Sequence, residues 1–379
     1  MYFAFAVCNL ERMASAQGRA GRSGSLGFFS GFSLFGSGKS GVGLSIGAST
    51  AKAVEIKKKG KGWEFSSFSS SPVEGALSDQ REILNSAVIA EAIRDAFAKA
   101  KISNKEICVS IAGSGVIIKT LSVTVANMKE LNEQILWEAE QYIPFDINDV
   151  VIDYEVLRKL KDNQVEVIIV AVKNDVLDQI RDSVEAAKMK INVIDVEVFA
   201  LQNCFEMNYD PPMNQAVMIA DIGAMSTKVV ICAEGIPLFT KDSPYGGGMV
   251  TQEIQRELKL PSPMDAEVLK ISGNLPQEVG EIVARTSHTL GSELKKSLDF
   301  YNASSVGPPV SVVYLSGGAS RAPGLPSIIS EYVGVPVEFL NPFERVSVNT
   351  KKFSPEFLES IASEVVIPMG LAMRSRDKK

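Results

Sequence analysis

A pattern of apolar strand, glycine turn and second apolar strand occurs twice in this chain, once in each half. The first copy spans residues 42–54 around Gly47, and the second spans residues 217–231 around Gly223. Each copy predicts a β-hairpin whose turn leaves backbone N–H groups free and whose small side chains let a phosphate group approach closely. A third glycine turn follows the apolar run at residues 310–314. The repeat and the third turn together predict a two-lobed fold that holds a nucleotide.

The composition is that of a globular protein with room for two or three domains. The chain has 379 residues, of which 45% are hydrophobic, so each domain can bury a substantial core. The net charge of −6 and the sequence pI of about 5.2 argue against a nucleic-acid partner. The four cysteines lack metal-binding or redox spacing and there is one histidine, so neither a zinc site nor a histidine-based triad is expected.

Strand-like and helical runs alternate along most of the chain, which is typical of an α/β fold. In the segments expected to be helical, apolar residues recur every three or four positions. These segments are residues 86–100, 131–143, 174–187, 277–301 and 361–374. The last of them contains Pro368, where we expect a kink. No apolar run approaches the length of a membrane span.

Four short motifs carry a family resemblance. They are the first glycine turn with its strand at residues 43–47, the stretch Trp-Glu-Ala-Glu-Gln-Tyr-Ile-Pro-Phe at 137–145, the run Tyr-Gly-Gly-Gly at 245–248 and Asn-Pro-Phe at 341–343. In these motifs the chain resembles the PilM-type type IV pilus assembly proteins, which are similar to the division protein FtsA. The stretch at 137–145 is the more family-specific signal, whereas the glycine turns mark the wider superfamily.

The resemblance implies an α/β, actin/Hsp70-like two-lobed ATPase fold with an inserted α+β subdomain in the first lobe. The expected parts are a flexible Gly/Ser-rich tail at residues 1–40, a first lobe at 41–210 with the insert at about 127–195, and a second lobe at 211–379 with a smaller subdomain at 245–305. The last helix, residues 361–374, either stays with the second lobe or packs back on the first.

The resemblance also implies a function, that of a cytoplasmic scaffold in type IV pilus assembly. Its expected ligands are ATP with Mg²⁺, and its expected partners are the cytoplasmic tail of a PilN-type inner-membrane protein and other pilus assembly proteins. Association with the membrane is expected only through those partners, and an oligomer is left open. We expect the insert to form one wall of a groove against the first lobe, in which the tail lies as an extended peptide.

The expected nucleotide site follows from the same resemblance. The phosphate turns are Gly47, Ala48 and Ser49 in the first hairpin and Gly223, Ala224, Met225, Ser226 and Thr227 in the second. The rest of the cleft is Gly246, Gly247 and Gly248 at the start of a helix and Gly317, Gly318 and Ala319 against the adenosine. Asp221 is expected to hold Mg²⁺ through water.

Three further residues have two readings each. Glu293 and Lys296, one helical turn apart, either contact the ribose or adenine or form a solvated charge pair. Glu197 is a weak catalytic candidate that either positions a water molecule or is an ordinary surface carboxylate.

Ser45 departs from the superfamily pattern, which has Asp at this place in the first hairpin, as Asp221 is in the second. Loss of that carboxylate removes an anionic partner for Mg²⁺ and its waters, so we expect ATP binding with weak or no hydrolysis. Two alternatives remain: an FtsA-like division or type II secretion scaffold of the same fold, and a sugar or metabolite kinase. A kinase needs a catalytic base that faces a small-molecule pocket, and the sequence offers no clear candidate.

Overall fold

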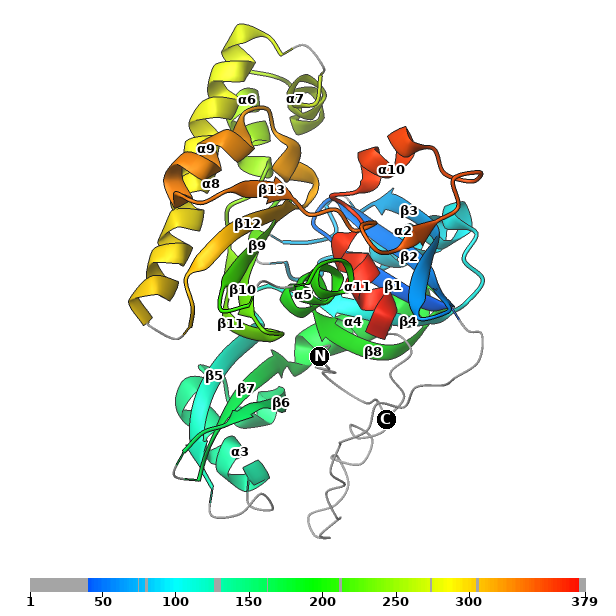
Figure 1. Ribbon diagram of the computed structural model, residues 1–379. Coiled ribbons are helices and arrows are strands. Elements are labelled where there is room, and N and C mark those ends of the chain that lie inside the picture. Colours follow the sequence, from blue (N-terminus) through cyan, green and yellow to red (C-terminus); the bar gives the residue numbers. More distant parts are fainter. Residues whose placement is uncertain are drawn as a thin grey trace.

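The computed structural model describes most of the chain as two lobes, each built on its own β-sheet, with a third small sheet attached (Figure 1). The expected tail at residues 1–40 lies outside the described part, apart from Ser40. The described residues are 40–73, 75–78, 81–125, 131–161, 163–210, 213–272, 275–304 and 307–374. Within them, no helix is both long and apolar enough to cross a membrane.

The first lobe has a six-stranded sheet in which β1 pairs antiparallel with β2 and parallel with β4. In spatial order its strands are β14 (Ser347–Val348), β3 (Gly62–Pro72), β2 (Thr50–Lys59), β1 (Gly41–Ile46), β4 (Glu106–Ile111) and β8 (Lys190–Val196). Helices α2 (Ser86–Ala100) and α4 (Asn174–Ala186) pack against each other on this lobe. The side chain of Asn85 caps α2, and the predicted apolar stripe of α2 is buried.

The second lobe has a five-stranded sheet that repeats the hairpin of the first. Its order is β11 (Ile236–Ser243), β10 (Thr227–Ala233), β9 (Ala216–Ile222), β12 (Val310–Ser316) and β13 (Val337–Phe339). The long helix α8 (Gln277–Ser304) packs its second half on this sheet together with α9 (Leu325–Val333). Its first half forms a separate small core with α6 (Gly248–Leu258) and α7 (Pro263–Lys270).

The insert is a three-stranded antiparallel sheet with one helix and its own apolar core. It comprises β5 (Val116–Thr124), α3 (Leu131–Tyr142), the short 3-10 helix η1 (Ile147–Asp149), β6 (Val150–Lys159) and β7 (Gln164–Lys173). The predicted boundary at about 127–195 differs from this at both ends. β5 belongs to the insert because it pairs with β7 along its whole length, whereas α4 packs on α2 and β8 pairs with β4 in the first lobe.

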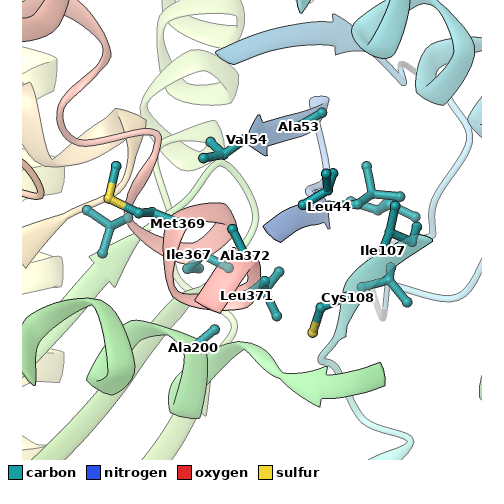
Figure 2. Close-up of a cluster of buried hydrophobic side chains, with 14 of the residues drawn as sticks. Leu44, Ala53, Val54, Ile107, Cys108, Ala200, Ile367, Met369, Leu371 and Ala372 are labelled. Carbon is teal, nitrogen blue, oxygen red and sulfur yellow. The ribbon is translucent and has the colours of Figure 1, made fainter. Parts of the chain in front are cut away.

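Two helices lie side by side between the lobes, α5 (Glu197–Asn208) and α11 (Val366–Arg374) (Figure 1). α11 packs on β1, β2 and α5, and its apolar residues join the first lobe's core (Figure 2). Glycines permit this close approach. A Cβ on Gly43 would lie 1.9 Å from the carbonyl oxygen of Pro368, and a Cβ on Gly370 would lie 1.9 Å from that of Ala200.

The C-terminal part of the chain therefore returns to the first lobe. The last helix takes the second of its two predicted positions, and the predicted second lobe at 211–379 ends before β14. β14 pairs with β3, and α11 packs on the first lobe's sheet. The single kinked helix predicted at 361–374 is also wrong, because α10 (Pro355–Ile361) ends before α11 begins. Pro368 lies in the first turn of α11, where its missing N–H group breaks no helical hydrogen bond.

Candidate functional site

The second glycine turn is held directly against the segment that follows β11. In the turn itself, the Gly223 N–H donates to the Ser226 carbonyl at 2.9 Å. The Gly247 N–H donates to the Gly223 carbonyl at 2.9 Å, and the Gly248 N–H donates to the Ala224 carbonyl at 2.7 Å. Two of the predicted phosphate-binding segments are therefore joined by backbone hydrogen bonds.

The third glycine turn closes on the same place. Gly317 has φ of +86°, and a Cβ there would lie 2.4 Å from the Ile222 carbonyl oxygen. A Cβ on Gly247 would lie 2.5 Å from the Cβ of Ala319. Side chains at these glycines would separate the segments, so the three turns of the second lobe can meet only as glycines. Gly318, beside them, is exposed.

The first glycine turn reaches this cluster through Arg81. The Gly47 N–H donates to the Thr50 carbonyl at 2.9 Å, which closes the first hairpin. The Arg81 guanidinium donates to the Ile46 carbonyl at 3.0 Å and to both carboxylate oxygens of Glu197, at 2.9 and 3.1 Å. Ala48 and Ser49 remain at least partly exposed in the turn. Arg81 thus links the first hairpin to the beginning of α5.

Glu197 lies at the centre of the site and is only 1% exposed, so its interpretation as a surface carboxylate is wrong. Lys228 of the second hairpin forms an ion pair with it at 3.2 Å, and the Ser110 hydroxyl donates to it at 3.3 Å. Burial alone would raise the pKa of Glu197, but the positive charges of Arg81 and Lys228 lower it to about 2. Glu197 is therefore a permanent anion that bridges the two hairpins.

Asp221 is the carboxylate that the second hairpin offers to Mg²⁺, an ion that usually takes one or two carboxylates together with waters and phosphate oxygens. Asp221 is buried, its Oδ2 accepts a hydrogen bond from the Ser316 hydroxyl at 2.7 Å, and Lys228 lies opposite it across the hairpin. Ser45 offers a hydroxyl where the family pattern has a carboxylate. The described residues hold no group of three or more His, Cys, Asp or Glu side chains that could bind a metal ion. The predicted role of Asp221, which is to hold Mg²⁺ through water, stays a prediction.

The second turn also contains a buried hydroxyl group without a partner. Ser226 is 7% exposed, and its Oγ makes no hydrogen bond within the described part of the chain. The Thr227 hydroxyl is already used, because it donates to the Tyr245 carbonyl at 2.6 Å. Met225 is half-buried beside them. Four serines in the described part of the chain have a buried hydroxyl without a partner. Ser226 is the one that lies in a predicted phosphate turn, which makes it a binding candidate.

Glu293 and Lys296 lie on α8, near the second hairpin. Lys296 forms an ion pair with Glu293 at 2.5 Å, and Lys241 approaches the same carboxylate to 3.6 Å. Glu293 also lines a cavity of about 10 Å³ with Thr227 and Ser243, which is the space of one water molecule. The Lys296 side chain is exposed, whereas that of Glu293 is only 12% exposed, so the two residues are not equally solvated. A role in ribose or adenine binding stays a prediction.

Comparison with known proteins agrees with the family and the fold that the sequence motifs predict. The family model described as type IV pilus assembly protein PilM matches residues 43–376. The chain belongs to this family. A chain of the solved PilM-PilN type IV pilus biogenesis complex is 29% identical, and the match covers 89% of this chain and 99% of that chain with a TM-score of 0.80.

A more distant structure shows the same fold. The ethanolamine utilization protein EutJ from Carboxydothermus hydrogenoformans is 14% identical, with a TM-score of 0.55 over 88% of this chain and 89% of that chain. The predicted actin-like, two-lobed ATPase fold and the family assignment are both confirmed.

Sequence reasoning missed two cations of the site. Lys228 carried a usable signal, since it ends the second glycine pattern as Lys52 ends the first. Lys52 pairs with Glu364, just before α11, at 3.3 Å, and Lys228 pairs with Glu197, at the beginning of α5. Each hairpin lysine thus binds a glutamate beside one of the two helices between the lobes. Arg81 lies in a loop without periodicity, and nothing near it in the sequence marks it.

Proposed function

We propose that this protein is a nucleotide-binding scaffold of type IV pilus assembly. It binds ATP between its lobes and holds the cytoplasmic tail of a PilN-type inner-membrane protein. It works on the cytoplasmic face of the membrane, which it reaches through such partners. The observation that carries the proposal is the match, over 89% of this chain, to a chain solved in a PilM-PilN complex.

The convergence of the glycine turns supports nucleotide binding. Gly223, Gly247 and Gly317 bring three backbone segments together, with the unpartnered Ser226 hydroxyl beside them. The N–H groups of Gly223, Gly247 and Gly317 themselves donate to protein carbonyls, so the prediction that these N–H groups are free is wrong. These glycines shape the turns, and the Ser226 hydroxyl beside them is free to donate to a phosphate oxygen. The likeness to proteins of the actin-like ATPase fold supports the same role. ATP is the nucleotide that the family resemblance implies.

Hydrolysis is expected to be weak or undetectable. A general base must be free to accept a proton and needs a pKa near the working pH. Glu197 is held by Arg81 and Lys228, and its pKa of about 2 makes it a poor base. Ser45 adds no carboxylate on the first hairpin. The site suits a protein that uses ATP as a bound ligand.

The nucleotide part is tested by replacing the unpartnered hydroxyl. Ser226→Ala removes a donor to phosphate without breaking a hydrogen bond of the free protein, so ATP affinity should fall by about tenfold while folding is unchanged. Isothermal calorimetry on the full chain measures the affinity. Ser67→Ala is the matched control, since Ser67 is equally buried and also unpartnered but lies on β3. Equal affinities in the two variants would remove Ser226 from the site.

The insert supports the partner-binding part. On α3, Leu136, Trp137 and Tyr142 are 41%, 59% and 49% exposed, which is unusual for large apolar side chains on one helix. β5 is an edge strand of the adjoining sheet. An extended tail can gain main-chain hydrogen bonds along such an edge, while the exposed side chains of α3 select its sequence.

The partner site is tested by Trp137→Ala. Trp137 is largely exposed, so folding should change little, whereas binding of a PilN-type tail peptide should weaken by about tenfold or more. Phe300→Ala on α8 is the control, an exposed aromatic side chain of the opposite lobe. Fluorescence anisotropy with a labelled peptide measures both. Hydrogen exchange should slow in the insert and the first lobe, and protection confined to residues 245–305 would refute this placement.

A further inference from the structure

Each glycine hairpin has its own buried cation. Arg81 donates to the Ile46 carbonyl, immediately before Gly47, and its side chain is 8% exposed. Lys228 is also 8% exposed, and its Nζ lies 3.5 Å from the place where a Cβ on Gly223 would be. Phosphate groups bound at the two turns would therefore meet one positive charge each.

Arg81 is positioned by a tight turn. Its φ of +66° lies in the left-handed region, which is uncommon for residues other than glycine. The backbone is held there because the Arg81 N–H donates to the Ser78 carbonyl at 2.9 Å and Leu77 bridges to Ile83. Six other described non-glycine residues share this conformation, so it fixes the course of the turn and does not by itself mark a ligand site. The planar guanidinium suits the oxygens of a phosphate group.

The two corresponding hairpin positions offer a divalent cation one carboxylate between them. Asp221 is the remaining carboxylate of the two hairpin positions, and its Oδ2 already accepts from Ser316. Ser45 removes the second carboxylate, and Glu197 is occupied by two cations. Arg81 and Lys228 thus supply positive charge beside the two turns. The carboxylate of Glu197 offsets part of it, and those of Asp221 and Asp242 also act on Arg81.

We propose that the cleft binds the nucleotide polyphosphate without requiring a divalent cation, because Arg81 at the first turn and Lys228 at the second offset its charge. The inference rests on the proposed nucleotide binding. Glu197 holds both cations in place in the free protein. When a nucleotide binds, its phosphates become a second anionic partner of Arg81 and Lys228, beside Glu197.

The test compares ATP binding by the full chain in buffer with Mg²⁺ and in buffer with EDTA, by isothermal calorimetry. The two dissociation constants of the natural protein should agree within about threefold. Arg81→Gln should lose about tenfold or more in EDTA, and Arg81→Lys should lose less because the charge remains. Arg94→Gln is the control, since Arg94 also donates to a backbone carbonyl, that of Ala186, but is exposed and lies on α2.

Each outcome decides between the proposals. If the natural protein binds ATP only with Mg²⁺, the nucleotide-binding function stands and the cation-independent site is overturned. An Arg81→Gln variant with unchanged ATP affinity in EDTA overturns the cation-independent site as well. Absence of binding in both buffers overturns both proposals. Adding Ser45→Asp to Arg81→Gln should recover affinity in Mg²⁺ but not in EDTA, since it restores the missing carboxylate. The comparison of buffers uses the natural protein and does not depend on whether a variant folds.

Discussion

Replacing Gly370 with alanine is expected to destabilise the protein by about 3 kcal/mol or more. The added Cβ would lie 1.9 Å from the Ala200 carbonyl oxygen, a backbone atom of α5 that cannot rotate away. α11 must then move from α5, and its buried residues lose their contacts with the first lobe's core. The midpoint of urea unfolding and the melting temperature measure the effect.

Gly43→Ala should have an effect of similar size from the other side of α11. Its Cβ would lie 1.9 Å from the Pro368 carbonyl oxygen and 2.6 Å from the Ala372 nitrogen. Gly280→Ala is the control, because α8 leaves open space around Gly280 and alanine favours a helix by up to about 1 kcal/mol. If all three variants melted alike, the close contact of β1, α11 and α5 would not be an important source of stability.

Glu197→Gln is expected to cost about 3–5 kcal/mol of folding stability, because it leaves the buried Arg81 and Lys228 without their carboxylate. The matched control is Glu364→Gln. Glu364 pairs with Lys52 in the corresponding position, but the two side chains are 35% and 20% exposed, so its loss should cost at most about 1 kcal/mol. Urea unfolding at neutral pH measures both variants, and equal midpoints would contradict the central role of Glu197.

The same carboxylate predicts part of the dependence of stability on pH. The pKa of Glu197 falls from its ordinary value of 4.5 to about 2 in the folded protein, which corresponds to about 3 kcal/mol. Because the folded pKa is the lower one, this stabilisation is complete above about pH 4.5 and is lost as the pH falls towards 2. The difference in unfolding free energy between the natural protein and Glu197→Gln should therefore shrink over this range. A difference that stays constant from pH 6 to pH 3 would show that Glu197 does not titrate in this way.

The sequence predicted the elements that local patterns encode. The hairpins around Gly47 and Gly223 were found because a strand, a tight glycine turn and a second strand follow one another within residues 42–54 and 217–231. The helix at residues 86–100 was found because its apolar stripe, its Asn85 cap and its length all agree. The family-specific stretch at 137–145 identified the family, which the family model confirms.

The boundaries of the insert and the path of the chain between the lobes were harder to predict, because they depend on which strand each strand pairs with. β5 precedes the predicted insert, but β7 pairs with it along its length, and β8 leaves the insert for β4. The sequence of β8 is equally suited to either sheet. α11 could pack on either lobe by its composition, and it takes the first because Gly43 and Gly370 let it approach β1 and α5.

The sequence by itself determined the fold, the family and the glycine turns, since each depends on residues close together in the chain. Only the tertiary structure decided which charged side chains meet in the site. Arg81 and Glu197 are separated by 116 residues and meet only because the loop before α2 and the beginning of α5 flank the same hairpin. The pKa of Glu197 follows from that meeting in a buried place, and no pattern of neighbouring residues encodes burial and charge pairing over such a distance.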